Sequence, residues 1–238
     1  MIPKTIHYCW FGDKELSKDA RKCIDTWKKY CPEYKIVKWS EKNFDVNSHP
    51  FVAQAYKEKK WAFVTDYVRL QVIYNEGGIY LDTDVVLLKN MDDLLRHPAF
   101  FGAEQLKKFV ATGLGFGAEK NNSVVRKLLD SYDSVTFDIE NIRMLSCPRL
   151  NTNVFLELGY MQNGKYQDIG DAVIYPPEYF DPIAPGSDEN LINEITYSIH
   201  LYNASWSPTR YHIKTIIRKL IGPKKLIKIK QFMNRILK

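Results

Sequence analysis

The sequence predicts one α/β domain over residues 1–208, followed by a basic helical tail over residues 209–238. Three observations predict this organisation. The chain opens with the pattern of a strand, a helix and a second strand. An apolar helix, a Gly-Gly turn and a buried strand follow, and the charge balance changes abruptly near residue 210. With 45% hydrophobic and 26% charged residues, the composition is that of a folded globular protein and excludes intrinsic disorder.

The opening elements follow from local patterns. We expect a strand over residues 4–10, with Gly12 in the turn that closes it. Ser17 is a suitable N-cap for a helix over residues 18–30, in which apolar residues recur at helical spacing and after which a proline follows. Residues 34–39 then alternate as a short strand.

The later elements follow in the same way. Helices are expected over residues 50–59 and 61–75, and the Gly-Gly turn at residues 77–78 ends the second of them. Two more helices are expected over residues 123–132 and 151–159. An irregular, proline-rich connection precedes the last strand. The remaining strands are expected at residues 79–81, 85–88, 100–103, 113–118, 172–175 and 197–202.

The main chemical feature is the segment EGGIYLDTDVV, residues 76–86. Asp82 and Asp84 follow an apolar strand, and carboxylates at alternate strand positions point the same way. Two such charges repel each other unless a cation neutralises them. Mn²⁺ and Mg²⁺ prefer oxygen ligands and can keep coordination sites open for phosphate oxygens. The motif therefore indicates a metal site, against the alternative of a solvated turn with two unrelated acids.

The helix before this motif carries Asp66 and Arg69 on one face. One interpretation is an intrahelical salt bridge. The other is a ligand-binding pair, in which Asp66 accepts hydrogen bonds from ribose or sugar hydroxyls and Arg69 approaches the sugar or diphosphate. The Gly-Gly turn brings this helix beside the aspartates, which favours the second interpretation.

Trp10 and His200 gain meaning in combination with these acids. Trp10 ends the first strand, where α/β sheets bind their ligands, and is either a core residue or a flat surface for a base. His200 lies on the last expected strand. It is either a satisfied polar residue or the third metal ligand, a role that a neutral imidazole can fill.

Together these segments resemble glycosyltransferase family 32. That family includes bacterial capsular and lipopolysaccharide transferases, the yeast initiating mannosyltransferase and, more distantly, the glucosylating domains of large clostridial toxins. The matching text is IPKTIHYCWFG, then AFVTDYVRLQVIYNEGGIYLDTDVV, then HLYNASW. The resemblance is dense over residues 1–95 and returns at 198–206. It implies a GT-A fold, a Rossmann-like mixed central sheet flanked by helices, with the donor at the carboxyl ends of the strands.

The resemblance also implies roles for single residues on the donor side. Trp10 corresponds to the tryptophan that stacks on the uracil ring. Asp66 and Arg69 correspond to the pair that contacts sugar and ribose, and Arg69 could add charge stabilisation during the reaction. The sequence shows no dedicated nucleophile.

Further roles concern the metal and the diphosphate. Asp82 corresponds to the first acid of the DxD motif, facing ribose, sugar and metal, and Asp84 to the direct metal ligand. His200, Ser205 and Trp206 occupy the segment that closes over the diphosphate. Candidates for lining the acceptor side are Glu104, Arg149, Asn151 and Asn153.

The activity that the resemblance implies is a metal-dependent, retaining transfer of a hexose or N-acetylhexosamine. The donor would be a UDP-sugar and the acceptor a polysaccharide or lipid-linked saccharide, such as a bacterial capsule or lipopolysaccharide intermediate. Two alternatives stay open. A metal-dependent sugar-nucleotide phosphodiesterase needs more carboxylates and histidines than the sequence shows, and a non-catalytic membrane-associated scaffold would bind UDP-sugars without turnover.

The tail differs from the body in charge. Residues 210–238 hold ten Lys or Arg and no acid, which leaves 24 basic against 28 acidic residues, or −4, in residues 1–209. Apolar residues recur at helical spacing among these charges, a pattern typical of a helix on an anionic membrane surface. Docking onto the body or onto a second subunit is the alternative. The acidic body argues against nucleic acid.

The ends and the cysteines bear on location. The N-terminus lacks the long apolar region of a signal peptide, and no stretch approaches the roughly 20 apolar residues that span a bilayer. We therefore expect a cytoplasmic protein, peripheral on the inner face of the membrane. The four cysteines show neither CxxC nor zinc spacing, which predicts buried or half-buried thiols in a reducing compartment.

Overall fold

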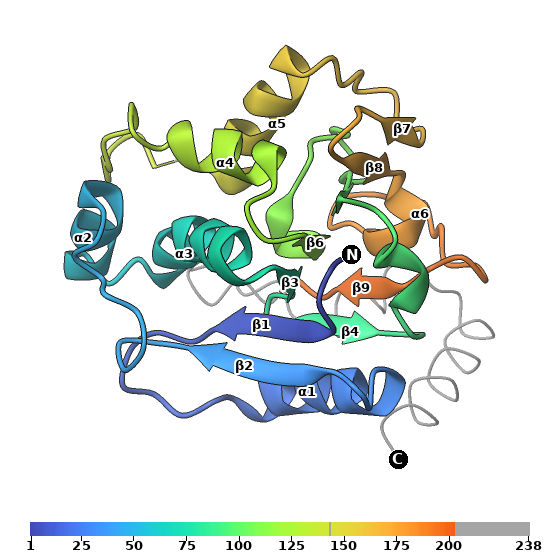
Figure 1. Cartoon of the computed structure of the whole chain (residues 1–238), viewed down its shortest axis with the longest axis horizontal. Helices are drawn as coiled ribbons and strands as arrows, with labels where there is room; N and C mark the ends of the chain where they lie inside the picture. The colour runs from blue at the N-terminus through green and yellow to red at the C-terminus, as the bar shows by residue number, and fades with distance from the viewer. Residues whose placement is uncertain (143, 203–238) are drawn as a thin grey trace.

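The fold is built on a seven-stranded mixed sheet with the strand order β2-β1-β3-β6-β5-β8-β7 (Figure 1). The computed structural model describes residues 1–142 and 144–202, so the expected basic tail, Ser205 and Trp206 lie outside the described residues. The strands of the sheet are β1 (Thr5–Cys9), β2 (Lys35–Trp39), β3 (Gly78–Tyr80), β5 (Ala99–Gly102), β6 (Phe116–Ala118), β7 (Gln167–Asp168) and β8 (Val173–Tyr175).

Strand direction determines where functional residues gather. Strand β1 pairs in parallel with β2 and β3, and β5 pairs in parallel with β8. Strand β6 is antiparallel to both β3 and β5, and β7 is antiparallel to β8. Strands β1, β2, β3, β5 and β8 therefore all point the same way, and their carboxyl ends lie at one edge of the sheet. This mixed sheet between helices is the GT-A fold that the resemblance implies.

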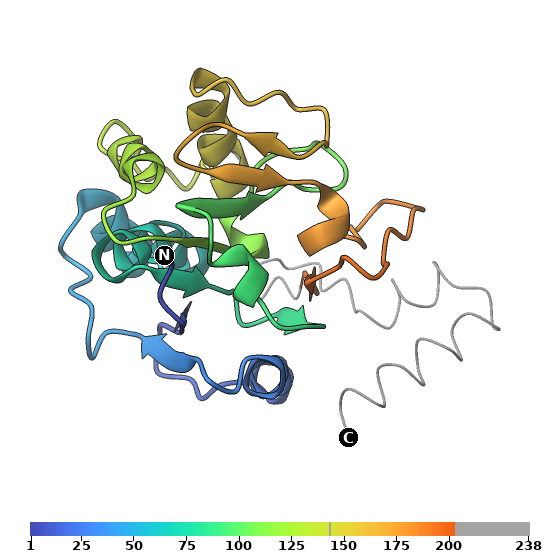
Figure 2. The same cartoon turned by 45° about the vertical axis from the view of Figure 1, so that its right-hand side comes forward.

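Helices cover both faces of the sheet, as the two views in Figures 1 and 2 show. One face carries α2, α3, α4 and α5, and the other carries α1, α6 and a two-stranded sheet made of β4 and β9. The bounds are α1 (Lys18–Tyr30), α2 (Pro50–Lys57), α3 (Trp61–Glu76), α4 (Ser123–Asp130), α5 (Cys147–Glu157), α6 (Pro177–Phe180), β4 (Val85–Leu87) and β9 (Ser198–His200). Short 3₁₀ turns span Asp92–Leu94 and Thr112–Leu114.

Alternating strand residues fill two separate cores. In β5, Phe101 packs into the core under α2–α5, and Phe100 packs into the core beneath α1. Tyr80 and Ile79 divide between the same two cores. Burial on both faces explains why these strands read as nearly continuous apolar runs rather than alternating ones. Each fully buried Phe contributes roughly 1.5–3 kcal/mol from its transfer out of water.

Two glycines end α3 for steric reasons. Gly77 and Gly78 have φ angles of 67° and 108°, which L-residues with a side chain rarely adopt. A β-carbon on Gly77 would lie 2.9 Å from the Lys120 nitrogen, and one on Gly78 would lie 2.7 Å from the Thr5 carbonyl oxygen. Only a Gly-Gly pair therefore lets the chain turn from α3 into β3 beside β1.

The expected elements are confirmed with several corrections. Helix α5 begins four residues earlier than expected, at Cys147, with Pro148 in its first turn, where proline is tolerated. The expected strand over 113–118 is shortened to β6 because its first part forms a 3₁₀ turn. The proline-rich connection contains α6, and β7 was not expected. Strand β4 does not extend β3 but pairs with β9 in the second sheet.

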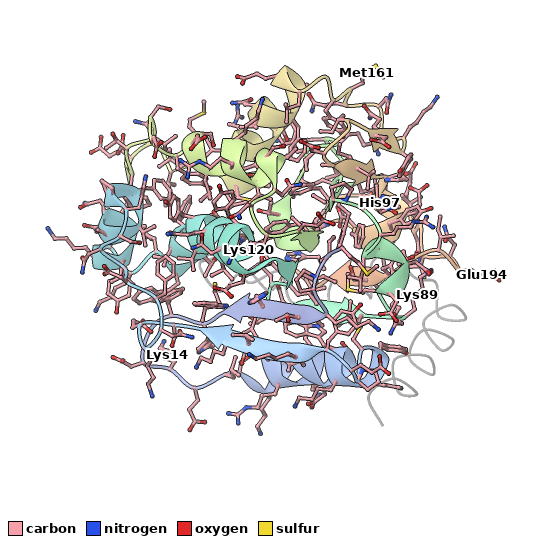
Figure 3. The ribbon with its side chains drawn as sticks, in the orientation of Figure 1. Lys14, Lys89, His97, Lys120, Met161 and Glu194 are labelled. Carbon is pink, nitrogen blue, oxygen red and sulfur yellow. The ribbon has the colours of Figure 1, made fainter. Side chains whose placement is uncertain are left out.

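The second sheet is fastened to its surroundings at several points. The Trp27 indole donates to the Val85 carbonyl at 2.8 Å, which ties β4 to α1. At the other end, the Lys89 ammonium donates to the Glu194 carbonyl at 3.3 Å, and both side chains lie at the same margin of the molecule (Figure 3). The register places Val85 opposite His200. The position of His200 is thus determined by pairing with the strand that follows the DxD motif.

Two other expectations concern the chain as a whole. All four cysteines are free and buried, as expected. Within the described ranges, every helix falls short of the length and apolar character that a membrane-crossing helix requires.

Candidate metal centre and cleft

Asp82, Asp84 and His200 converge at the carboxyl edge of the sheet. The His200 Nε2 atom lies 3.2 Å from Asp84 Oδ1 and 4.0 Å from Asp82 Oδ2. One ligand atom from each residue falls within 4.8 Å of the other two. The side chains are 25%, 20% and 13% exposed in the order Asp82, Asp84, His200, so they are sheltered yet reachable. Two oxygens and one imidazole nitrogen in this arrangement could hold a divalent cation.

The acids come from a turn rather than from the strand itself. Strand β3 ends at Tyr80, and the Val85 nitrogen donates to the Asp82 carbonyl at 3.0 Å, which closes a tight turn between β3 and β4. The Leu201 nitrogen donates to the Asp84 carbonyl at 2.9 Å and holds β9 alongside. The two carboxylates face the same way because of this turn, not because of strand alternation as the sequence pattern suggests.

The buried pair Asp66–Arg69 lies directly behind Asp82. Arg69 Nη2 donates to Asp66 Oδ1 at 2.9 Å and lies 3.3 Å from Asp82 Oδ1. Arg69 Nε also donates to the Thr65 carbonyl at 3.0 Å. The side chains of Arg69 and Asp66 are only 4% and 10% exposed. The intrahelical salt bridge of the first interpretation is therefore present, and the same arginine also reaches the first acid of the motif.

The two carboxylate oxygens of Asp82 have different neighbours. Its Oδ1 atom accepts from the Tyr80 hydroxyl at 2.9 Å and faces Arg69, whereas Oδ2 faces His200. Burial raises the pKa of Asp82, and Arg69 opposes that shift. One oxygen thus fixes the carboxylate while the other points to the metal centre.

The charges of the neighbouring groups are strongly coupled. Burial raises the pKa of Asp66 to about 7, although Arg69 acts in the opposite direction. Burial alone would lower the pKa of His200, but Asp84 and Asp82 outweigh it and raise the pKa to about 9. His200 is therefore held against an excess of negative charge, which is also the environment that attracts a cation.

A second polar layer supports Arg69 and Asp82. Thr112 Oγ1 accepts from Asn151 Nδ2 at 3.0 Å and lies 3.0 Å from Cys147 Sγ. A β-carbon on Gly113 would lie 2.8 Å from Asp82 Oδ2 and 3.2 Å from Arg69 Nη1. The 3₁₀ turn before β6 is therefore packed directly against both charged groups.

These groups line a cleft of about 2250 Å³. Ligand pockets typically measure roughly 300–1,000 Å³, so the cleft has room for more than one substrate. Trp10 also lines the cleft, and its indole N–H donates to the Lys14 carbonyl at 2.6 Å, which anchors the ring at the wall. The cleft therefore brings Trp10, Asp66 and Arg69 together with the candidate metal site of Asp82, Asp84 and His200.

The candidates for the acceptor side separate into two groups. Glu104 and Arg149 line the cleft. Asn151 is 1% exposed and bonded to Thr112, so it supports the site from behind instead of lining it. Asn153 is exposed and does not line the cleft either.

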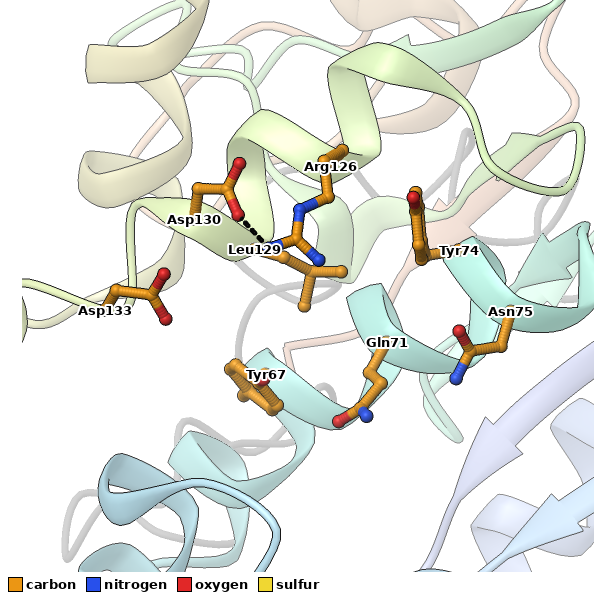
Figure 4. Close-up of a pocket in the computed structure, with 8 residues that line it drawn as sticks. All are labelled: Tyr67, Gln71, Tyr74, Asn75, Arg126, Leu129, Asp130 and Asp133. Carbon is orange, nitrogen blue, oxygen red and sulfur yellow. Dashed lines mark ion pairs between the residues drawn. The ribbon is translucent and has the colours of Figure 1, made fainter.

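A second, much smaller recess of about 100 Å³ lies between α3 and α4 (Figure 4). Its guanidinium group, on Arg126, is paired with Asp130 and lies over the Tyr74 ring. Its lining residues are entirely different from those of the large cleft. The recess is too small for a nucleotide, and its guanidinium group is already paired.

Several site residues escape sequence reasoning. Tyr80 reads as a core strand residue, and Thr112 and Cys147 read as ordinary buried side chains. The only local signal near them is the pair of glycines in the segment ATGLG, residues 111–115. Trp61, which lines the cleft at the start of α3, reads as part of that helix's apolar stripe.

Comparison with known proteins finds similarity to glycosyltransferases. Residues 17–101 match the family described as "Glycosyltransferase sugar-binding region containing DXD motif". An uncharacterized glycosyltransferase of Acanthamoeba polyphaga mimivirus is 28% identical over 224 residues, which cover 90% of this chain and 86% of that protein. Inositol phosphoceramide mannosyltransferase 3 of Schizosaccharomyces pombe is 32% identical over 106 residues, 42% of this chain and only 29% of that protein.

A solved structure shares the fold. The PaToxG glycosyltransferase superimposes with a TM-score of 0.54 at 24% identity, over 66% of this chain and 68% of that one. This likeness concerns the fold, whereas the matched region contains Asp66, Arg69 and the DxD acids. The resemblance found in the sequence is thus confirmed: part of the chain matches a glycosyltransferase sugar-binding region with a DXD motif, and the fold is the GT-A fold of a solved glycosyltransferase.

Proposed function

We propose that this protein transfers a hexose or N-acetylhexosamine from a UDP-sugar to a saccharide acceptor, with retention of configuration and with a bound Mn²⁺ or Mg²⁺. The observation that carries the proposal is the convergence of Asp82, Asp84 and His200 in a cleft that also contains Trp10 and the Asp66–Arg69 pair. A metal centre, a flat aromatic ring and buried hydroxyl-binding carboxylates are the parts that a sugar nucleotide requires.

The donor set fits a divalent cation. Asp82 Oδ2, a carboxylate oxygen of Asp84 and His200 Nε2 supply mixed oxygen and nitrogen ligands at the mouth of a cleft large enough for phosphate oxygens to complete the coordination. When bound, the cation would supply positive charge that stabilises the UDP leaving group. The same site in a phosphodiesterase would require a positioned water, and no observation favours that alternative.

The protein side chains would mainly position the substrates. Trp10 would stack on the base, and Asp66 would accept hydrogen bonds from sugar or ribose hydroxyls. Arg69 is buried and already paired with two carboxylates, which supports a role in orienting Asp66 and Asp82. The acceptor hydroxyl would attack the anomeric carbon from the face that UDP leaves. The bond to the phosphate oxygen would break, and that oxygen would take the acceptor's proton.

The setting of the reaction is part of the proposal. The matched yeast relative is named as an inositol phosphoceramide mannosyltransferase, so a lipid-borne acceptor has a parallel among similar proteins. The basic segment 210–238, for which the sequence predicts an amphipathic pattern, would hold the enzyme on an anionic membrane surface at the cytoplasmic face, as in bacterial capsule or lipopolysaccharide synthesis. Loss of binding to anionic liposomes on deletion of these residues is expected, and unchanged binding would refute the membrane role.

The decisive test is release of nucleotide from a panel of UDP-sugars, with GDP-mannose as a competitor, in the presence and absence of Mn²⁺. We expect slow hydrolysis of one UDP-sugar that EDTA abolishes. Asp84→Ala should abolish release while the unfolding curve stays close to that of the wild type, because Asp84 is partly exposed and lies in a turn.

Two results would contradict the proposal. Activity of Asp84→Ala near the wild-type level would refute the role of Asp84 as a metal ligand. Metal-dependent binding of UDP without turnover of any sugar nucleotide would favour a non-catalytic scaffold instead.

A further inference from the structure

The parallel strands place three side chains in a row along one edge of the sheet. Trp10 follows β1, Asp82 follows β3, and Glu104 follows β5. Strand β6 separates β3 from β5, so two strand spacings of about 4.8 Å put Glu104 roughly 10 Å beyond the metal centre. If the base lies at Trp10 and the diphosphate at Asp82, a substrate continuing along this edge reaches Glu104 next.

The segment that carries Glu104 is a rigid hairpin. The Glu104 nitrogen donates to the Phe109 carbonyl at 2.8 Å, and Ala103 bridges to Val110. The adjacent Gln105 is 3% exposed and anchors the hairpin from behind: its nitrogen donates to Asp181 Oδ2 at 2.8 Å and its Oε1 accepts from the Ala184 nitrogen at 3.0 Å. The backbone at Glu104 is therefore fixed before any ligand binds.

The Glu104 side chain has the features of a binding group that lacks its ligand. It lines the cleft and is half-buried. Within the part of the chain that the structure describes, it makes no hydrogen bond and no ion pair. Burial and then the nearby Asp181 raise the pKa of Glu104 to about 7, since both oppose its charged form. A sheltered carboxylate of this kind needs hydrogen-bond donors, and a sugar hydroxyl supplies them.

The cleft residues around Glu104 come from other elements than the Asp66–Arg69 pair. Asp66 and Arg69 belong to α3, whereas Glu104 belongs to the hairpin 104–109 and Arg149 to the start of α5. Lys107 and Phe109 complete a surface of hydroxyl-binding, basic and apolar groups. This composition suits a sugar ring, whose edge carries hydroxyls and whose faces are apolar.

We infer that Glu104 binds a hydroxyl group of the acceptor saccharide and that the hairpin 104–109, together with Arg149, forms the acceptor subsite. This inference rests on the proposed function and adds to it the side of the cleft that the acceptor enters. It assigns Glu104 to acceptor binding and leaves the donor to Trp10, Asp66 and the DxD acids.

The test compares hydrolysis with transfer in Glu104→Gln, a change that keeps the size of the side chain. UDP release to water is measured without acceptor, and transfer of a radiolabelled sugar is measured on an array of immobilised saccharides and octyl glycosides. We expect hydrolysis within about twofold of wild type and a loss of about 10- to 100-fold in kcat/KM for the acceptor, the range for a hydrogen bond to a charged group. Glu157→Gln, at an exposed carboxyl on α5, is the matched control and should change neither rate.

The possible results distinguish a failure of this inference from a failure of the proposed transferase function. Wild-type protein without metal-dependent UDP release would refute the proposed function itself. Equal losses of hydrolysis and transfer in Glu104→Gln would place Glu104 on the donor and overturn the inference, and so would unchanged transfer. A wild-type enzyme that hydrolyses its donor but transfers to no saccharide on the array would also overturn it.

Discussion

Replacement of Gly113 by alanine should damage the metal centre while sparing the fold. The new β-carbon would lie 2.8 Å from Asp82 Oδ2, whereas ordinary contact begins at 3.4 Å, so the carboxylate must retreat by about 0.6 Å. The oxygen that moves is the far end of a side chain, which makes the shift inexpensive for folding. That oxygen also faces His200 across the metal centre, so the same shift distorts the ligand geometry.

The expected size of the effect follows from the sensitivity of catalytic geometry. A misplacement near 1 Å can reduce a rate by about 100-fold, equivalent to about 2.7 kcal/mol of transition-state stabilisation. We expect Gly113→Ala to lower kcat/KM for UDP release by about 10- to 100-fold and to weaken Mn²⁺ binding, measured by titration. The free energy of unfolding in urea should change by less than about 1 kcal/mol.

Gly159→Ala is the control, because it should lower stability without changing activity. Gly159 has a φ of +90° and no neighbour within 4 Å of an added β-carbon. This variant should lose about 1 kcal/mol of stability from backbone strain and keep its activity. Wild-type activity and Mn²⁺ affinity in Gly113→Ala would show that the position of Asp82 does not control the site, and would refute the reasoning.

Two further predictions concern buried charged groups. Arg69→Met should lower the free energy of unfolding by about 3–5 kcal/mol in urea titrations, because it leaves two carboxylates in the interior without their cation; a loss below about 1 kcal/mol would contradict that account. Burial lowers the pKa of His7 from 6.5 in the unfolded chain to about 4 in the folded protein. Between these two pH values the imidazole is therefore protonated in the unfolded chain and neutral in the folded one. Stability should therefore fall as the pH drops from 6.5 to 4, by up to about 3 kcal/mol, and His7→Asn should flatten this dependence; equal slopes in both proteins would argue against it.

Much of the fold could be predicted from local pattern. The helix over residues 18–30 and the turn at residues 77–78 depend on caps, glycines and periodicity that neighbouring residues specify. Strand β4 was placed correctly, but its pairing with β9 in a second sheet was not predicted. An apolar run specifies burial, whereas its partner, β9, lies far away in the sequence.

Some residues of the candidate site could be predicted from local sequence, and others could not. The DxD acids and the Asp66–Arg69 pair lie in one continuous segment, so chain context and the family resemblance indicated them together. The supporting layer of Thr112, Gly113 and Asn151 could not be predicted, because these residues contribute only through contacts that the tertiary fold creates. Their residue types carry no chemical signal of their own.

The two-stranded sheet of β4 and β9 links the candidate metal centre to the last strand that the structure describes. One strand carries His200 while the other follows Asp84, and the Trp27 indole ties this sheet to α1. A ligand that binds only the closed arrangement stabilises it in proportion to its concentration. The cation would thus link β9, which carries His200, to the turn that carries Asp82 and Asp84. Separation of β9 from β4 would remove His200, one of the three candidate ligands, from the site.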